Sequence, residues 1–133
     1  MWDFIKMFLV AFVVFMLVEG IWLVVVAKEF YKKEIGYIMS KSPKLIPTVV
    51  FSLVFVIGLV FFVIKPALLK DSWQYALLVG IFFGLVTYST YDLTNHANLE
   101  GWPLKVTIVD LIWGGSMSAI VSTLSFFILK MIG

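Results

Sequence analysis

Three carboxylates lie at or inside the ends of apolar stretches of this sequence, and they are the residues best suited to chemistry. Glu19 interrupts one apolar stretch, Asp92 ends another and Asp110 lies inside a third. Ionisable side chains are costly in lipid and are seldom kept there without a function. Because burial and mutual repulsion both disfavour ionised carboxylates, we expect at least one of the three to exchange its proton near neutral pH. This is the chemistry of a proton-coupled or cation-binding site.

Tryptophans accompany two of the carboxylates. Trp22 follows Glu19 by three residues, and Trp113 follows Asp110 by the same interval. Antiparallel helices would bring Trp22 near the level of Asp110 and Trp113 near the level of Glu19. If these helices touch, each indole N–H could donate to the carboxylate of the other helix.

A third group of polar residues shares one helix face. Gly84, Tyr88, Asp92 and His96 recur at four-residue intervals, with Asn95 adjacent. Side chains at this spacing project to one side of a helix, and this side is not expected to face lipid.

We expect a polar crevice with the carboxylates at its base. Its substrate-binding or proton-binding residues are predicted to be Glu19, Trp22, Tyr88, Asp92, Asn95, Asp110 and Trp113. The alternative is structural, with carboxyl groups that stay protonated and form hydrogen bonds to Tyr, Trp and Ser side chains across helices. The two interpretations are balanced for Asp92 near the membrane interface, whereas the greater depth of Glu19 and Asp110 favours function.

Small residues continue the helix face that begins at Asp110. Gly114, Ser118 and Ser122 follow it at four-residue spacing. Small residues at this spacing let another helix backbone approach closely, so we assign these three to helix packing.

No metal site and no cofactor are expected. Asp92 and His96, one helical turn apart, come nearest to a metal-ligand pair, but a lone histidine near a loop is more often solvated or a helix cap. The sequence also lacks the common catalytic motifs: it has no nucleophile elbow, Walker loop or dinucleotide fingerprint. Enzyme chemistry would have to be acid–base work by the carboxylates with Tyr88 or Tyr91 on a lipid-like substrate, and we treat it as an alternative.

The composition is that of an integral membrane protein. Of 133 residues, 62% are hydrophobic and only 14% are charged, far from the balance of a soluble domain. All ten basic residues are Lys, and the net charge is +2 without a long basic run, so nucleic-acid binding is not expected. The absence of Cys excludes disulfides and thiolate metal sites.

Four apolar stretches predict four transmembrane helices, over about residues 7–27, 46–64, 75–95 and 104–129. Between the first two, residues 28–44 carry an amphipathic pattern that fits a short helix in the headgroup layer, and a polar loop fits equally well. Lys65 and Pro66 are predicted to end the second span. The expected fold is all-α, one four-helix membrane domain over residues 1–133 with short loops.

The distribution of Lys gives an orientation, and helix rise gives the depths. Six Lys fall on the side of the first and third loops and four on the other side, which predicts that these two loops are cytoplasmic, with a dual or reversed topology left open. Glu19 lies roughly 12 Å from the first-loop side, Asp110 lies roughly 9 Å from it, and Asp92 lies at its rim. All three carboxylates are therefore expected in one leaflet.

Several short motifs resemble those of a family of bacterial membrane proteins known as domain of unknown function 2177. They are Glu19 with Trp22, Pro66 to Leu68, Tyr91 to Asn95, Gly101 to Pro103, and Val109 to Gly114. The similarity covers essentially the whole chain and implies a small multi-pass protein without an assigned activity. The family often carries Asp at the position of Glu19 and usually an apolar residue at that of His96, which weighs against a metal site there.

These observations favour proton-linked or cation-linked binding and transport of a small molecule or ion. The alternatives are a membrane-embedded lipid-modifying enzyme and an accessory subunit of a membrane complex. Four helices enclose little space, so a homo-oligomer or a partner membrane protein is expected beside the lipid bilayer. The expected location is the bacterial cytoplasmic (inner) membrane.

Overall fold

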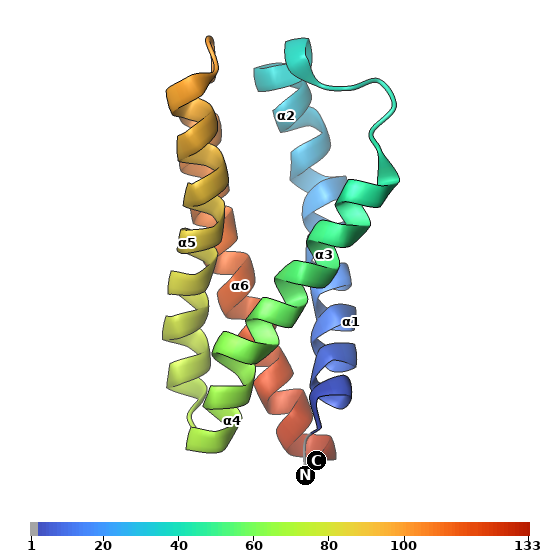
Figure 1. Ribbon diagram of the computed structural model, residues 1–133, viewed down its shortest axis with the longest axis vertical. Coiled ribbons are helices and arrows are strands. Elements are labelled where there is room, and N and C mark those ends of the chain that lie inside the picture. Colours follow the sequence, from blue (N-terminus) through green and yellow to red (C-terminus); the bar gives the residue numbers. More distant parts are fainter. Residues whose placement is uncertain (1–2) are drawn as a thin grey trace.

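The computed structural model describes residues 3–133, and every regular element in this range is a helix. Four helices are long and apolar enough to cross a membrane: Phe4–Ile38, Leu45–Lys70, Trp73–Asn98 and Leu104–Ile132. They run up and down in one bundle, with the start of the first helix and the end of the last helix at the same end of it (Figure 1). The prediction of an all-α fold with four transmembrane helices is confirmed.

The first helix is longer than the sequence patterns predicted. It consists of α1 (Phe4–Trp22), a π-helical turn η1 (Leu23–Ala27), α2 (Lys28–Ile35) and a 3₁₀ turn η2 (Gly36–Ile38). The short helix predicted after the first span is present as α2, but it continues the first span instead of lying apart in the headgroup layer. The continuation has a simple cause, because no Gly, Pro or capping side chain separates Trp22 from Lys28.

The second helix continues through the proline that was predicted to end it. It consists of α3 (Leu45–Leu59), a second π-helical turn η3 (Val60–Ile64) and α4 (Lys65–Lys70). A proline cannot donate to the preceding turn and its ring crowds that turn, and the wider π turn just before Pro66 accommodates both effects. The helix ends instead at Asp71, whose backbone is left-handed with φ 51°. Lys130 Nζ lies 2.5 Å from the carboxylate of Asp71 and ties this end to the last helix.

The third and fourth helices, α5 (Trp73–Asn98) and α6 (Leu104–Ile132), form the closest pair in the bundle. A Cβ atom added to Gly84 on α5 would lie 2.0 Å from the carbonyl oxygen of Gly114 on α6, so the two backbones touch at this point. The same added Cβ would lie 2.7 Å from Ser118 Oγ, and one on Gly80 would lie 3.2 Å from Ser122 Oγ. The small residues of α6 therefore pack against the glycines of α5 inside this chain.

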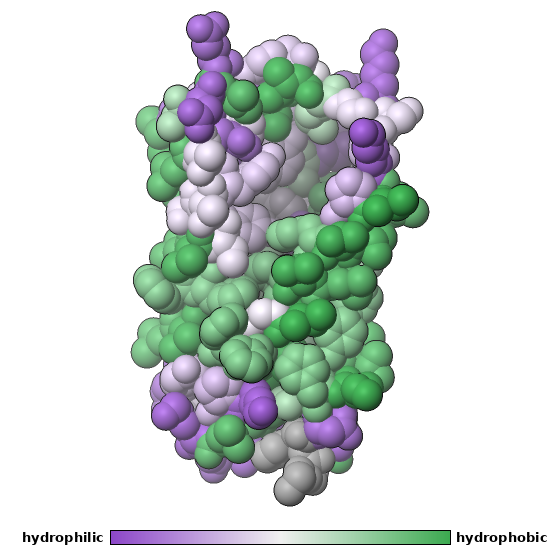
Figure 2. Space-filling model, viewed as in Figure 1, coloured by the Kyte–Doolittle hydropathy of each residue, from purple (hydrophilic) through white to green (hydrophobic). Residues whose placement is uncertain are grey.

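Hydrophobic side chains from α1, α3, η3 and α6 fill the half of the bundle that holds the chain ends. Val56, Leu59, Val60 and Ile64 are fully buried there. Figure 2 shows a broad hydrophobic belt around the molecule and hydrophilic side chains gathered at both ends, as expected of a chain that crosses a bilayer. At the opposite end, the start of α3 stands away from α5 (Figure 1), and the surface between them is hollowed (Figure 2).

Candidate functional site

Asp110 forms the centre of the candidate site. It lies on the second turn of α6 and only 5% of it is exposed. The phenol of Tyr31, on α2, donates a hydrogen bond to Asp110 Oδ1. The prediction had given Trp22 the role of donor to this carboxylate, and the structure gives that contact to Tyr31 instead.

Tyr31 was missed because its segment was predicted to lie outside the first span. A continuous helix through η1 keeps Tyr31 inside the bundle, where it also interacts with Trp22. The π turn adds a residue between α1 and α2, and each added residue rotates the following helix face by roughly 100°. The sequence signal that could have found Tyr31 was the absence of any helix breaker after Trp22.

Asp92 is the most deeply buried of the three carboxylates. It lies on α5, its exposure is 0%, and both of its carboxyl oxygens lack a hydrogen-bond donor. Its carboxyl group interacts with that of Asp110. The sequence had placed Asp92 at the rim of the membrane, but α5 continues beyond it to Asn98 and Trp102 covers the same end of the bundle, so the side chain is enclosed.

Glu19 joins the group from α1. Its carboxylate interacts electrostatically with Asp110 and with Trp113. The rings of Trp22 and Trp113 stack, with centroids 4.2 Å apart and planes inclined by 9°. The two predicted tryptophans thus meet, but ring against ring, and both Glu19 Oε2 and Trp113 Nε1 are buried without a hydrogen-bond partner.

Tyr88 connects the carboxylates to the packing glycines. Its ring occupies the space beside Gly114, where an added Cβ would lie 2.4 Å from Tyr88 Cγ. The phenol interacts electrostatically with all three acids, Glu19, Asp92 and Asp110. Gly114 therefore has a second use, because the absence of its side chain leaves room for the tyrosine that faces the acids.

His96 and Asn95 take other partners. His96 Nδ1 lies 3.1 Å from Thr107 Oγ1, and the same hydroxyl accepts a hydrogen bond from Trp102 Nε1 at 3.0 Å. Asn95 interacts with the phenol of Tyr91. Within residues 3–133, no three His, Asp or Glu side chains are arranged to hold a metal ion.

A hollow of about 630 Å³ lies between α3 and α5, and we call it the side groove. It is lined by Pro47, Thr48, Phe51, Thr87, Tyr88 and Tyr91. Tyr88 belongs to both the side groove and the carboxylate group, so the groove ends one side chain away from the acids. Figure 2 shows the hollow from outside, in the half of the molecule away from the chain ends.

No basic side chain of the described residues neutralises the acids. The ion pairs in residues 3–133 join Lys105 to Glu34 at 3.6 Å and Lys130 to Asp71 at 2.5 Å. Neither pair includes Glu19, Asp92 or Asp110, although Lys105 and Glu34 lie within about two helical turns of Asp110 and Tyr31 on the same two helices. A buried carboxylate pair without a neighbouring basic side chain has to hold a proton or bind a cation from outside.

Comparison with known protein families agrees with this membrane architecture. Residues 4–127 match a family model described as "Predicted membrane protein (DUF2177)". The chain belongs to the DUF2177 family. The family resemblance noted in the sequence motifs is therefore confirmed, and the family description names no activity. No curated protein and no solved structure matches the chain.

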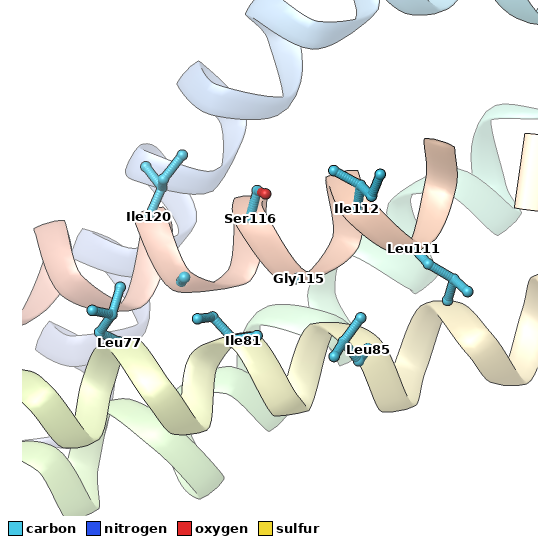
Figure 3. A pocket seen from close by; sticks show the side chains of 9 residues that line it. Leu77, Ile81, Leu85, Leu111, Ile112, Gly115, Ser116 and Ile120 are labelled. Atoms are coloured by element: carbon cyan, nitrogen blue, oxygen red, sulfur yellow. The ribbon is translucent and has the colours of Figure 1, made fainter. Parts of the chain in front are cut away.

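A second hollow, of about 430 Å³, lies between α5 and α6 and has none of the chemistry of the carboxylate site. Figure 3 shows that the aliphatic side chains of Leu77, Ile81 and Leu85 on α5 point toward α6, and that Leu111 of α6 points toward α5. The side chain of Ser116 is the polar group among those that line it. This groove suits lipid chains, because none of the side chains that line it is ionisable.

Proposed function

We propose that this DUF2177 protein binds a cation in exchange for a proton at the Asp92–Asp110 pair and moves it across the membrane. The observation that carries the proposal is the state of Asp92, which is fully buried with two unpartnered oxygens beside a second carboxyl group. Such an arrangement costs folding free energy and is retained where it serves a function. Proton exchange and cation binding are the two processes that can neutralise the pair.

The surrounding groups divide into roles under this proposal. Asp92 and Asp110 are the exchanging carboxyls, and Glu19 is a third acceptor within electrostatic range of Asp110. Tyr31 holds Asp110 in place through its hydrogen bond. Tyr88 stands between the acids and the side groove and interacts with each of the acids. Trp22 and Trp113 form a stacked pair beside the acids that fixes the distance between α1 and α6.

The chain supplies little support for an accessory subunit that docks through the small-residue stripe. Gly114, Ser118 and Ser122 are buried against α5 of the same chain, so another protein's helix cannot use them. An oligomer or a partner protein remains a prediction and would have to use a different surface.

The proposal is tested with the purified protein reconstituted into the membrane of vesicles. The vesicles have an acidic interior that contains a pH-sensitive dye. We expect external Na⁺, K⁺ or a quaternary ammonium ion to cause loss of protons from the interior of vesicles with the wild-type protein. The Asp110→Asn protein should show no cation-driven proton movement above that of empty vesicles. Normal coupling in the Asp110→Asn protein would show that this carboxyl is not an exchanging group, and the proposal would fail.

The matched control is Asp71→Asn. Asp71 is an exposed acid at the other end of the bundle, and its carboxylate pairs with Lys130. The substitution removes the same charge as Asp110→Asn without touching the site. We expect cation-driven proton movement at the wild-type rate, and a loss as large as that of Asp110→Asn would point to general damage from removing an acid.

A further inference from the structure

The side groove has the size and lining of a small-molecule site. Its volume of about 630 Å³ falls within the range of roughly 300 to 1,000 Å³ typical of ligand pockets. Its walls come from two helices, Pro47, Thr48 and Phe51 from α3 and Thr87, Tyr88 and Tyr91 from α5. Three of these six side chains are aromatic. The hollow opens on the outer surface of the bundle between the start of α3 and α5, in the half away from the chain ends (Figure 2).

An unneutralised negative site lies behind the Tyr88 wall of the groove. Tyr88 forms part of the groove wall, and Asp92 follows it by one helical turn on the same helix. Asp92 is fully buried, no N–H or hydroxyl donates to either of its oxygens, and its carboxyl group interacts with that of Asp110, so the pair needs a proton or a cation between its members. The titratable groups that face the Asp92–Asp110 pair are Glu19 on α1, Tyr31 on α2, and Tyr88 and Tyr91 on α5. None of these groups is a cation.

Charge and lining together select a class of ligand. An anion is repelled by the carboxylates, and an inorganic cation, although it can neutralise the pair, gains no apolar contact from the aromatic lining of the groove. An organic cation gains apolar contacts with Phe51 and favourable contacts between its charge and the faces of Tyr88 and Tyr91. Its charge then compensates the carboxylate pair in a medium of low dielectric constant.

We propose that the side groove admits an organic cation with a bulky apolar body from the bilayer and delivers its charge to the Asp92–Asp110 pair. One monovalent cation replaces one proton of the pair, and the released proton goes to water, so the net charge of the site is unchanged. This inference rests on the proposed function and adds to it the ligand class and the route of entry.

The test uses two ions of nearly equal shape and opposite charge on the full-length protein in detergent. Tetraphenylphosphonium is the cation and tetraphenylborate is the anion, and benzyltrimethylammonium serves as a smaller cation. Binding is measured by equilibrium dialysis, and proton release is measured with a pH indicator in weakly buffered solution. We expect at least one of the two cations to bind with release of about one proton per protein, and affinity to fall about tenfold for each unit of pH on the acidic side. Tetraphenylborate should not bind above the detergent background.

Two tryptophan substitutions on the same turn of α3 separate the groove from the surrounding surface. Thr48→Trp places an indole in the groove, whereas Ile46→Trp places one at a position that is 77% exposed and does not line it. We expect cation affinity to fall at least tenfold in Thr48→Trp and to stay within twofold of wild type in Ile46→Trp. The carboxyl pair should still titrate in both variants when it is monitored by infrared spectroscopy. This titration is the evidence that each variant is folded.

The outcomes distinguish this inference from the function on which it rests. Four results would each overturn the groove inference. Both organic cations could fail to bind, or they could bind without proton release. Tetraphenylborate could bind as well as the cations, or the two tryptophan variants could lose affinity equally. The proposed function survives any of these results if the carboxyl pair still exchanges protons. It fails, together with the inference, if the pair does not titrate at all.

Discussion

Replacing Asp92 by Asn should stabilise the fold while it abolishes cation binding. The wild-type side chain buries two carboxyl oxygens without donors, beside the carboxyl group of Asp110. An unsatisfied buried polar group costs about 1–3 kcal/mol. The amide of Asn has nearly the same shape, carries no charge and can donate an N–H to Asp110, so it removes the repulsion that arises once the pair has released its proton. We therefore expect the free energy of unfolding to rise by about 2 kcal/mol, a factor of roughly 30 in the folding equilibrium.

The assay compares the free energies of unfolding of wild type and Asp92→Asn in mixed detergent micelles, by titration with sodium dodecyl sulfate. Asp71→Asn is the control, because Asp71 is an exposed acid that already adopts the left-handed backbone that Asn tolerates. Loss of its ion pair with Lys130 should cost at most about 1 kcal/mol. If Asp92→Asn leaves the stability unchanged or lowers it, the carboxyl is structural and the reasoning is refuted.

Further substitutions test other parts of the account. Tyr31→Phe removes the hydrogen-bond donor to Asp110, so a proton competes better with the cation for this carboxylate. We expect tetraphenylphosphonium to bind about tenfold more weakly at pH 7. Unchanged affinity would exclude a role for Tyr31. Gly84→Ala puts a methyl group 2.0 Å from the Gly114 carbonyl oxygen, so α5 and α6 must separate, and we expect a loss of about 3 kcal/mol or more in unfolding titrations. Gly20→Ala is its control, because an added Cβ there meets nothing within 4 Å, and it should be neutral or slightly stabilising.

Hydrophobic length and composition made the four helices predictable. The same reasoning placed Glu19 and Asp110 in one half of the bundle, because helix rise converts sequence position into depth whatever the side-chain contacts are. The closeness of Trp22 to Trp113 also followed from antiparallel helices. The two rings stack, Tyr31 takes the place expected for Trp22 at Asp110, and Trp113 interacts with Glu19, because each of these contacts depends on helix rotation.

Helix rotation is what the sequence did not reveal. Each of the two π turns adds a residue to a helical turn, and neither has a sequence signature. One turn brings Tyr31 to Asp110, and the other carries the second helix through Pro66. The burial of Asp92 could not be predicted from the sequence either, because it depends on how far α5 extends and on the position of Trp102 in the following loop.

The most direct test of the central claim is an infrared titration of the carboxyl groups in lipid-reconstituted protein. Difference spectra between about pH 5 and 9 are compared for wild type, Glu19→Gln, Asp92→Asn and Asp110→Asn. The account predicts a carboxyl band that changes between about pH 6 and 8 and that disappears in Asp92→Asn or Asp110→Asn. A wild-type spectrum in which no carboxyl band changes across this range would contradict the claim that the Asp92–Asp110 pair exchanges protons.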